Sequence, residues 1–340
     1  MDLAGAISAL SESRDLSGVE MQEVVSIIMQ GEATPAQIGA FLIALRIKGE
    51  AVEELAAAAR VVRKFAAGVS VKAEIVADTV GTGGDGAGLF NVSTAASLVA
   101  AGAGVVVAKH GNRAVTGKSG SADLLESGGV NIDLTPEQVG QTIDAIGIGY
   151  MFAPAHHGAF RHLVGPRREI GVRTIFNLLG PLTNPADAKY QLVGVFDRRW
   201  VRPIAEVFQT LGSIHTIVVH SVDGLDEISI AAPTNASELR NGEITDYVIE
   251  PEDFGIERQL LDTIRVGSAE ASLAMIQNAL VGGRGPAYDI VAINAGATIY
   301  AADHTDSLAA GVEEARRVLD SGAGFRKLEE MAEFTQKFRS

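Results

Sequence analysis

Three short segments of this 340-residue chain carry groups suited to binding phosphate. The first is a glycine-rich run at residues 81–86, where backbone amides can approach an anion closely. The second is Asn91-Val92-Ser93-Thr94, whose hydroxyl and amide groups cap helices and can also contact phosphate oxygens. The third, Lys109-His110-Gly111-Asn112-Arg113, is cationic. Together the three segments predict a site for a phosphorylated small molecule.

The glycine-rich run has two other interpretations, a packing turn and a dinucleotide site. Gly81, Gly83 and Gly86 fit the Gly-x-Gly-x-x-Gly pattern of dinucleotide-binding proteins. That pattern needs an acidic residue about 20 positions later to hold a ribose hydroxyl. Lys109 and His110 occupy that region instead. Cations suit phosphate, so an NAD-dependent dehydrogenase is a weaker alternative than phosphate binding.

The charge of the whole chain makes these cations unusual. Asp and Glu total 42 against 28 Lys and Arg, a formal net charge of -14. Such a surface repels nucleic acid and acidic membranes, so an anionic substrate needs a locally basic site. A second basic run, at residues 161–173, contains four arginines and one glutamate. One of these arginines could hold a carboxylate through two hydrogen bonds.

Asp226 and Glu227 are candidate ligands for a metal ion. Mg²⁺ binds one or two carboxylates and completes its shell with water and phosphate oxygens. Solvated turn residues are the alternative interpretation of this pair. The chain has no cysteine, which excludes thiolate metal sites and disulfides. His156, His157 and His162 lack a convincing metal-ligand spacing.

The elements that must position these groups change in type near residue 68. Capping boxes at Ser17–Glu20 and Thr34–Gln37 predict helix starts, and residues 52–65 a further helix. Beyond residue 68 we expect strands at 74–80, 105–108, 148–153, 192–196, 216–220 and near Ile290, and helices at 91–101, 135–146, 201–211 and 268–280. This alternation predicts an α/β fold with a mostly parallel sheet. Asn241-Gly242 predicts a hairpin turn.

The chain also carries information about its location. Its apolar runs are far shorter than the roughly 20 residues of a bilayer span, so we expect no membrane segment. Residues 1–16 lack a basic region followed by an apolar run, which argues against a signal peptide. We therefore expect a cytoplasmic protein that binds neither membranes nor nucleic acid.

The order of four motifs makes the chain resemble the anthranilate phosphoribosyltransferases. The motifs are Gly81-Thr82-Gly83-Gly84-Asp85, Asn91-Val92-Ser93-Thr94, Lys109-His110-Gly111-Asn112-Arg113 and Gly180-Pro181-Leu182-Thr183-Asn184-Pro185. The resemblance extends over nearly the whole chain. It implies an enzyme of tryptophan biosynthesis in which the amine of anthranilate attacks C1 of phosphoribosyl pyrophosphate and pyrophosphate leaves. It also implies Mg²⁺ as the cofactor, as a pair of ions.

The resemblance assigns roles by motif position. It implies contacts to the phosphoribosyl donor for Gly81, Gly84, Asp85, Leu89, Asn91, Val92, Ser93, Thr94, Lys109, His110, Gly111, Asn112, Arg113, Ala114, Val115, Thr116, Gly117 and Ser121. It implies contacts to anthranilate for Gly81, Asn112 and Arg167, and contacts to Mg²⁺ for Ser93, Asp226 and Glu227. It fixes no catalytic base, and His110 and His157 are candidate proton acceptors. The larger need is to stabilise charge on the departing pyrophosphate, because an aromatic amine is already neutral at pH 7.

Three positions depart from the family pattern. Leu89 stands where Thr or Ser is usual, which removes one hydroxyl contact to the donor. His157-Gly158-Ala159-Phe160 replaces a His-Pro-Ala-Met run, and Pro166 precedes Arg167 where a small aliphatic residue is usual. These last two changes affect the outer part of the anthranilate site.

The family implies a fold and partners as well. We expect a helical bundle domain at residues 1–68, completed by a helical segment near 162–185, and an α/β domain at 69–340. The site would lie between the domains, hinge closure would bring Arg167 toward the Lys109 segment, and a homodimer would form through the helical domain. A glutamine amidotransferase is a further partner that the sequence neither requires nor excludes.

Two alternatives share this architecture. A pyrimidine nucleoside phosphorylase carries a Ser-Gly-Arg-Gly type phosphate motif after its second strand, where this chain has Lys109–Arg113. A non-catalytic nucleic-acid-binding relative needs a broad basic face, which the net charge of -14 disfavours.

Overall fold

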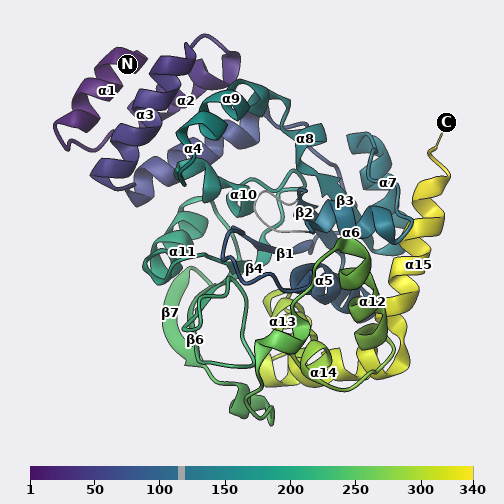
Figure 1. The fold of residues 1–340 in the computed structure, drawn as a ribbon. Coiled ribbons are helices and arrows are strands. Elements are labelled where there is room, and N and C mark those ends of the chain that lie inside the picture. Colours follow the sequence, from purple (N-terminus) through teal and green to yellow (C-terminus); the bar gives the residue numbers. More distant parts are fainter. Residues whose placement is uncertain (114–118, 340) are drawn as a thin grey trace.

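A computed structural model describes residues 1–113 and 119–339 of the chain (Figure 1). The predicted donor contacts at Ala114, Val115, Thr116 and Gly117 lie outside the described residues. The N-terminal part is helical, as the sequence predicts, with helices α1 (Leu3–Ser11), α2 (Gly18–Gln30), α3 (Pro35–Lys48) and α4 (Val52–Phe65). Both predicted capping boxes are present, at Ser17 with Glu20 and at Thr34 with Gln37.

The central sheet is mostly parallel, which confirms the predicted fold class. Its strands are β1 (Ala77–Gly81), β2 (Val107–Gly111), β3 (Ile148–Phe152), β4 (Tyr190–Gly194), β5 (His215–Ser221), β6 (Thr234–Arg240) and β7 (Glu243–Ile249). Within the described residues the order is β3-β2-β1-β4-β5-β6-β7, with β1 to β5 parallel and β6 and β7 antiparallel. The chain order reverses direction at β1, whose neighbours are β2 and β4. Open α/β sheets bind ligands at such a switch point.

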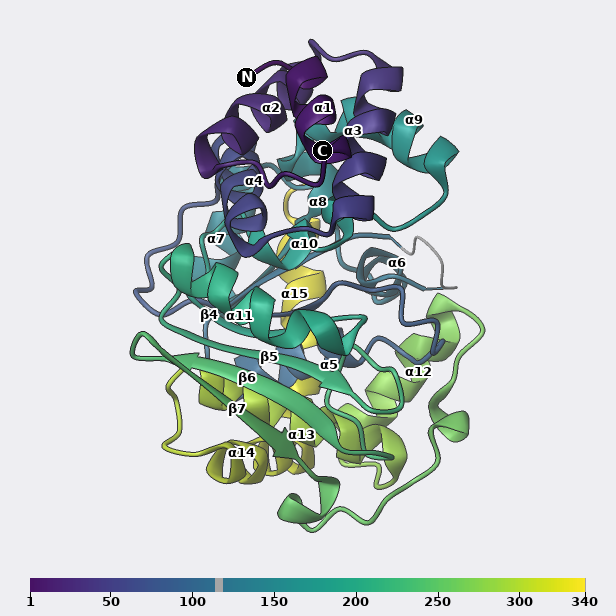
Figure 2. The ribbon, with the colours of Figure 1, turned by 90° about the vertical axis from the view of Figure 1, so that its left-hand side faces the viewer.

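The remaining helices cover the two faces and the ends of the sheet (Figures 1 and 2). They are α5 (Val92–Gly102), α6 (Ser121–Ser127), α7 (Pro136–Ile146), α8 (Ala153–His156), α9 (Arg161–Ile170), α10 (Leu179–Leu182), α11 (Val201–Thr210), α12 (Ala269–Leu280), α13 (Pro286–Ala301), α14 (Leu308–Ser321) and α15 (Ala323–Gln336). Helix α9 packs on α3 and α2 of the N-terminal bundle, although it is far from them in sequence. In the described part of the chain, no helix has the length and apolar character that crossing a bilayer requires.

Two predictions about elements need correction or extension, and a third is confirmed. The strand expected near Ile290 is wrong, because this segment lies in α13, where Pro286 occupies the helix start. Helix α13 is buried around most of its circumference, and a fully apolar run does not distinguish a helix from a strand. Strand β2 begins later than expected and includes Lys109, His110 and Gly111. The hairpin at Asn241-Gly242 is confirmed, with positive φ values of 54° and 78°.

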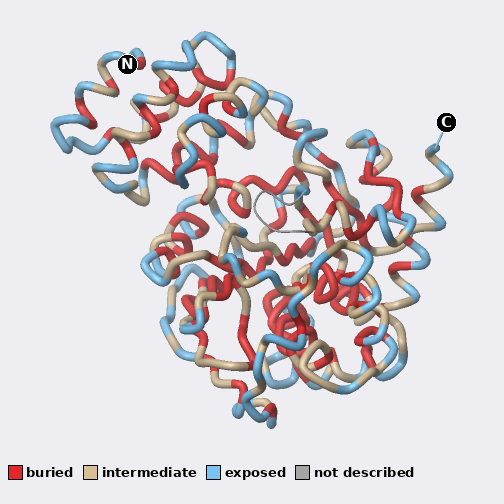
Figure 3. The backbone as a smooth tube through the Cα atoms, viewed as in Figure 1, coloured by how far each residue is buried: buried red, intermediate tan, exposed pale blue. Residues whose placement is uncertain are grey.

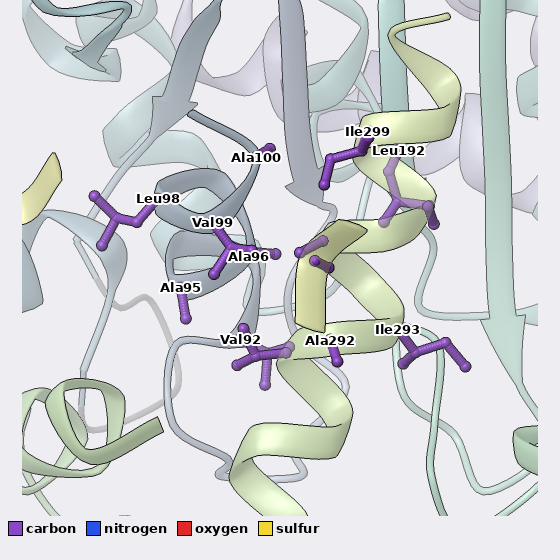
Figure 4. Close-up of a cluster of buried hydrophobic side chains, with 14 of the residues drawn as sticks. Val92, Ala95, Ala96, Leu98, Val99, Ala100, Leu192, Ala292, Ile293 and Ile299 are labelled. Atoms are coloured by element: carbon purple, nitrogen blue, oxygen red, sulfur yellow. The ribbon is translucent and has the colours of Figure 1, made fainter. Parts of the chain in front are cut away.

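Alternate residues of the strands face two hydrophobic cores, and buried backbone follows both faces of the sheet (Figure 3). Leu192 and Ile217 belong to the core that includes α5 and α13. Val193 and Val218 belong to the core that includes α11 and the N-terminal bundle. The bundle and the α/β part therefore share one core. Figure 4 shows α5 against α13, where small side chains such as Ala96 bring the helices close together.

Candidate active site

The predicted phosphate-binding segments meet at one edge of the sheet, because parallel strands direct their carboxyl ends to the same side. The glycine-rich run follows β1, the Lys109 segment ends β2, and the loop with Asp226 and Glu227 follows β5. Gly83 and Gly84 adopt φ values of 68° and 79°, which L side chains rarely adopt. These glycines let the chain turn from β1 toward α5.

Asp226 hydrogen-bonds to the glycine-rich run at residues 81–86, and Glu227 hydrogen-bonds to the first turn of α5. The Oδ2 atom of Asp226 accepts from the amide of Gly83 at 2.7 Å. The Oε1 atom of Glu227 accepts from the amide of Ser93 at 3.2 Å. The structure thus brings together residues that the sequence separates by more than 130 positions.

Two glycines provide the room for Asp226. A Cβ atom on Gly81 would lie 2.4 Å from Oδ2 of Asp226, and one on Gly194 would lie 1.4 Å from its carbonyl oxygen. Neither distance is compatible with a side chain. The ends of β1 and β4 are therefore shaped to admit this carboxylate.

Asp226 is buried and Glu227 is half-buried beside it, which disfavours their charged forms. Burial, followed by the charge of Asp85, raises the pKa of Asp226 to about 7. Burial and then the charge of Asp226 raise the pKa of Glu227 above its ordinary value. A cation would relieve this repulsion. No group of three or more His, Asp or Glu side chains among the described residues could hold a metal alone. The pair fits Mg²⁺ if phosphate oxygens and water supply the other ligands.

Asn91 does not act as the simple helix cap that its position permits. Helix α5 begins at Val92, and no side-chain cap bond from Asn91 is present in the described structure. Its Oδ1 atom accepts from the hydroxyls of Ser119 and Ser272, and its Nδ2 atom donates to the Ser119 carbonyl. Asn91 therefore ties the start of α5 to the Ser119 loop and to α12.

The neighbouring residues of α5 contribute in different ways. Val92 is fully buried, so only its backbone is placed to meet a ligand. The Thr94 hydroxyl is buried and has no hydrogen-bond partner among the described groups. Leu89 pairs with Arg265 through a backbone bridge beside the same loop.

Lys109 lies deeper than the sequence suggests. It is 3% exposed, and its ammonium donates to the Thr79 carbonyl at 2.8 Å. Burial lowers its pKa, while the charges of Asp78 and Glu227 oppose that shift. The cation therefore belongs to the interior behind the carboxylates rather than to an exposed loop.

The residues after β2 are held by α6. The Arg113 guanidinium forms ion pairs with Asp123 and Glu126, which raise its pKa. The Ser121 hydroxyl donates to the Asn112 carbonyl at 3.3 Å. A Cβ atom on Gly111 would lie 2.2 Å from the Ser121 oxygen. Asn112 itself is exposed at the site.

A row of aromatic rings links His110 to Arg167. The ring centroids of His110 and His157 are 5.1 Å apart, those of His157 and Phe160 are 5.5 Å apart, and those of Phe160 and Phe176 are 5.5 Å apart. The Arg167 guanidinium lies 5.8 Å from the Phe176 centroid. The structure thus brings the predicted residues Arg167, His110 and His157 into one continuous row.

The two histidines of the row are neutral at pH 7. Burial, followed by His156, lowers the pKa of His157 to about 4. Burial, followed by His157, lowers the pKa of His110 well below its ordinary value. The His157 ring nitrogens and Nε2 of His110 are buried and make no hydrogen bond of normal geometry with a described residue, although backbone groups of Thr183 and Gly180 interact with the two rings. A neutral imidazole can accept a proton or a hydrogen bond from a ligand.

Sequence reasoning missed two contributors. Arg173 donates to the Gly84 carbonyl and stacks over Phe196 with 4.3 Å between the guanidinium and the ring centroid. The sequence signal for Arg173 was its position in the basic run at residues 161–173. Asp78 and Asn184 hydrogen-bond to one another behind β2. Asn184 belongs to a motif already singled out, whereas nothing in the sequence pattern marks Asp78 apart from its strand.

Comparison with known proteins agrees with this geometry. Residues 73–325 match the model of the glycosyl transferase family a/b domain, and residues 4–66 match that of its helical bundle domain. An anthranilate phosphoribosyltransferase from Thioalkalivibrio sulfidiphilus is 58% identical over 98% of this chain and 99% of its own. One from Marinomonas is also 58% identical, over 100% of this chain and 99% of its own.

Solved structures agree as well. The anthranilate phosphoribosyltransferase from Thermus thermophilus superposes with a TM-score of 0.93 at 43% identity, over 97% of this chain and 99% of that chain. The Saccharomyces cerevisiae enzyme in complex with phosphoribosyl pyrophosphate and Mg superposes with a TM-score of 0.90 at 26% identity, over 99% and 98% of the two chains.

Proposed function

The chain belongs to the anthranilate phosphoribosyltransferase family, and from this premise we propose that it performs the family's reaction at the carboxyl edge of its sheet. The enzyme is a glycosyltransferase of tryptophan biosynthesis. The amine nitrogen of anthranilate forms a bond to C1 of the ribose. The bond from C1 to the pyrophosphate oxygen breaks, and the amine gives up one proton.

The donor region consists of residues 81–86, Asn91–Thr94, Asp226 and Glu227. At the start of α5, where no side chain caps the helix, backbone amides and the helix dipole favour a bound anion. Lys109 lies behind these groups as a buried cation. These groups support the proposal that the region binds the pyrophosphate of the donor.

Ser93, Asp226 and Glu227 would hold Mg²⁺, supported by the raised pKa of each carboxylate. A bound divalent ion neutralises charge that develops on the departing pyrophosphate. We propose a pair of ions, because one phosphoribosyl donor offers more oxygens than a single octahedral ion uses beside two carboxylates.

The acceptor region consists of Asn112, Arg167 and the ring row His110, His157, Phe160 and Phe176. Arg167 would hold the anthranilate carboxylate, and the rings would exclude water around the aromatic ring. Burial lowers the pKa of Arg167, so this guanidinium gains from pairing with a carboxylate. We propose that the neutral His110 or His157 ring receives the amine proton.

One observation carries this proposal: both carboxylates of the loop after β5 hydrogen-bond to amides of the donor region. The test mixes the protein with phosphoribosyl pyrophosphate, Mg²⁺ and anthranilate and follows the loss of anthranilate fluorescence. We expect loss of fluorescence that stops when Mg²⁺ is chelated. Phosphorolysis of thymidine, without loss of anthranilate, would favour the nucleoside phosphorylase alternative.

Three further features extend this proposal. We propose a homodimer formed through the helical domain, hinge closure that brings Arg167 toward Lys109, and a domain boundary at residue 68. Helix α9, which ends with the Arg167 turn, packs on α3 of the bundle, so movement of the bundle would carry Arg167 with it. The cytoplasmic location stays a prediction from the sequence.

A further inference from the structure

Strands β1 and β2 separate just where the site begins. The two strands are paired through Ala77 and Val107, and the Ala77 amide donates to the Val106 carbonyl at 2.8 Å. On its other side, β1 pairs with β4 from Ala77 to Gly81. A continued parallel ladder would use backbone groups of residues 79, 108 and 110.

Side chains take the place of that ladder. The Asn184 amide donates to the Ala108 carbonyl at 2.9 Å. The Oδ1 atom of Asp78 accepts from the His110 amide at 3.3 Å, and the Lys109 ammonium donates to the Thr79 carbonyl at 2.8 Å. Each of these groups meets a backbone atom that β1 or β2 would otherwise satisfy.

Asp78 and Asn184 are joined to one another within this arrangement. The Asn184 Nδ2 atom donates to Oδ2 of Asp78 at 2.8 Å, and its Oδ1 atom accepts from the Ala186 amide. Asp78 is 0% exposed and Asn184 is 3% exposed, so water does not replace these bonds. The pair connects β1, β2 and the Gly-Pro-Leu-Thr-Asn-Pro motif.

We infer that Asp78 and Asn184 are positioning residues that hold the split end of β2, and with it Lys109 and His110, in place for the phosphoribosyl donor. The inference rests on the proposed function. It gives the Gly180–Pro185 motif a role that the assignment of substrate contacts leaves open. The charge of Asp78 also stabilises the buried Lys109 ammonium, whose hydrogen bond goes to the Thr79 carbonyl.

The test compares Asp78→Asn, Asn184→Ser and the exchange Asp78→Asn with Asn184→Asp. Each single variant should lower kcat/KM for phosphoribosyl pyrophosphate by about tenfold to a hundredfold, since small misplacements near reacting groups cost this much. The KM for anthranilate should change less than kcat/KM for the donor, because Arg167 and the rings of His157, Phe160 and Phe176 do not lie on β2, and His110 is the one ring of the row that does. The exchange restores the hydrogen bond between residues 78 and 184 but removes the donor to the Ala108 carbonyl, so it should recover only part of the lost kcat/KM.

Gln191→Met is the matched control. Gln191 is fully buried opposite Asp78 on β4, and its amide donates to the Pro181 carbonyl of the same motif, away from β2. The control should lower the melting temperature but leave kcat/KM for the donor within about twofold. A loss equal to that of Asn184→Ser would show a general packing effect and overturn the inference.

The experiments distinguish failure of the positioning role of Asp78 and Asn184 from failure of the proposed function. A wild-type protein that consumes no anthranilate overturns both. An active wild type together with folded single variants that keep wild-type kcat/KM for the donor overturns the inference alone. Should Asp78→Asn fail to fold, Asn184→Ser decides the question, because it leaves Asp78 and Lys109 in place.

Discussion

The donor and acceptor regions of this enzyme are built by different means. In the donor region, carboxylates and backbone amides are already hydrogen-bonded to one another, as with Asp226 and Gly83. In the acceptor region, aromatic rings lie in a row, and the nitrogens of His157 have no partner among the described residues. The contrast indicates that the sheet preforms the proposed phosphate site, whereas the proposed acceptor site is lined by rings whose nitrogens make no hydrogen bond of normal geometry with described residues.

The largest expected effect concerns the two carboxylates of the donor region. Asp226→Asn with Glu227→Gln should lower kcat by at least about a thousandfold, because the variant loses the carboxylates that would hold Mg²⁺ against pyrophosphate. Steady-state kinetics at saturating Mg²⁺ measure it. Asp223→Asn, on the same loop but exposed, is the control and should change kcat less than threefold. Equal rates in the double variant and the wild type would remove the pair from the site.

A second prediction breaks the donor region without removing any charge. Gly81→Ala places a Cβ atom 2.4 Å from Oδ2 of Asp226, so the carboxylate must move. We expect kcat to fall by about a hundredfold, as misplacement of a reacting assembly does. Gly39→Ala, where a Cβ atom meets nothing within 4 Å, should leave kcat unchanged. A Gly81→Ala enzyme with normal kcat would mean that the observed position of Asp226 is not required.

The third prediction affects the acceptor region alone. Arg167→Ala should raise the KM for anthranilate by about tenfold or more, the usual cost of losing a charge-assisted hydrogen bond. The KM for the phosphoribosyl donor should change little. Arg168→Ala removes the exposed neighbour and serves as the control. An unchanged KM for anthranilate in Arg167→Ala would contradict the role of this guanidinium.

The last prediction concerns stability and follows from the buried imidazoles. The pKa of His157 is about 4 in the folded protein, below the ordinary value of about 6.5 for an unfolded chain. As the pH falls from 6.5 to 4, the unfolded state binds a proton that the folded state does not. His157 alone should therefore remove up to about 3 kcal/mol of stability across this window.

His157→Phe tests that prediction while preserving the ring row. The variant should lose less stability than the wild type between pH 6.5 and pH 4, as measured by denaturant unfolding at each pH. Part of the decline should remain, because burial also lowers the pKa of His110 and His156. Parallel stability curves for the variant and the wild type would show that His157 is protonated in the folded protein.

The two regions also differ in how far the sequence predicts them. The donor motifs are local. Their residue types, and the fact that each follows an expected strand, were sufficient to predict a phosphate site at one edge of the sheet. The link between Asp226 and Gly83 follows only from strand order, which sequence periodicity does not specify. The acceptor row depends on contacts between β2, the segment 157–160 that follows α8, helix α9 and the short helix Ile175–Asn177. The sequence supplied Arg167 and His157 for it only through the family resemblance.

Other misses have local physical causes. Lys109 was expected to follow a strand that ends at residue 108. The sequence does not show that the Thr79 carbonyl accepts a hydrogen bond from its buried ammonium, or that the charge of Asp78 stabilises it. The strand predicted near Ile290 is helical, since apolar runs buried on all sides have no period to distinguish them. Capping boxes and the Asn241-Gly242 turn were correct because a few adjacent residues determine them.

Calorimetry with the phosphoribosyl donor tests the central claim most directly. Phosphoribosyl pyrophosphate is titrated into the wild type and into Asp226→Asn with Glu227→Gln, each with and without Mg²⁺. The account predicts saturable heat only for the wild type with Mg²⁺. Absence of heat in that titration, or equal heat in the double variant, would contradict it.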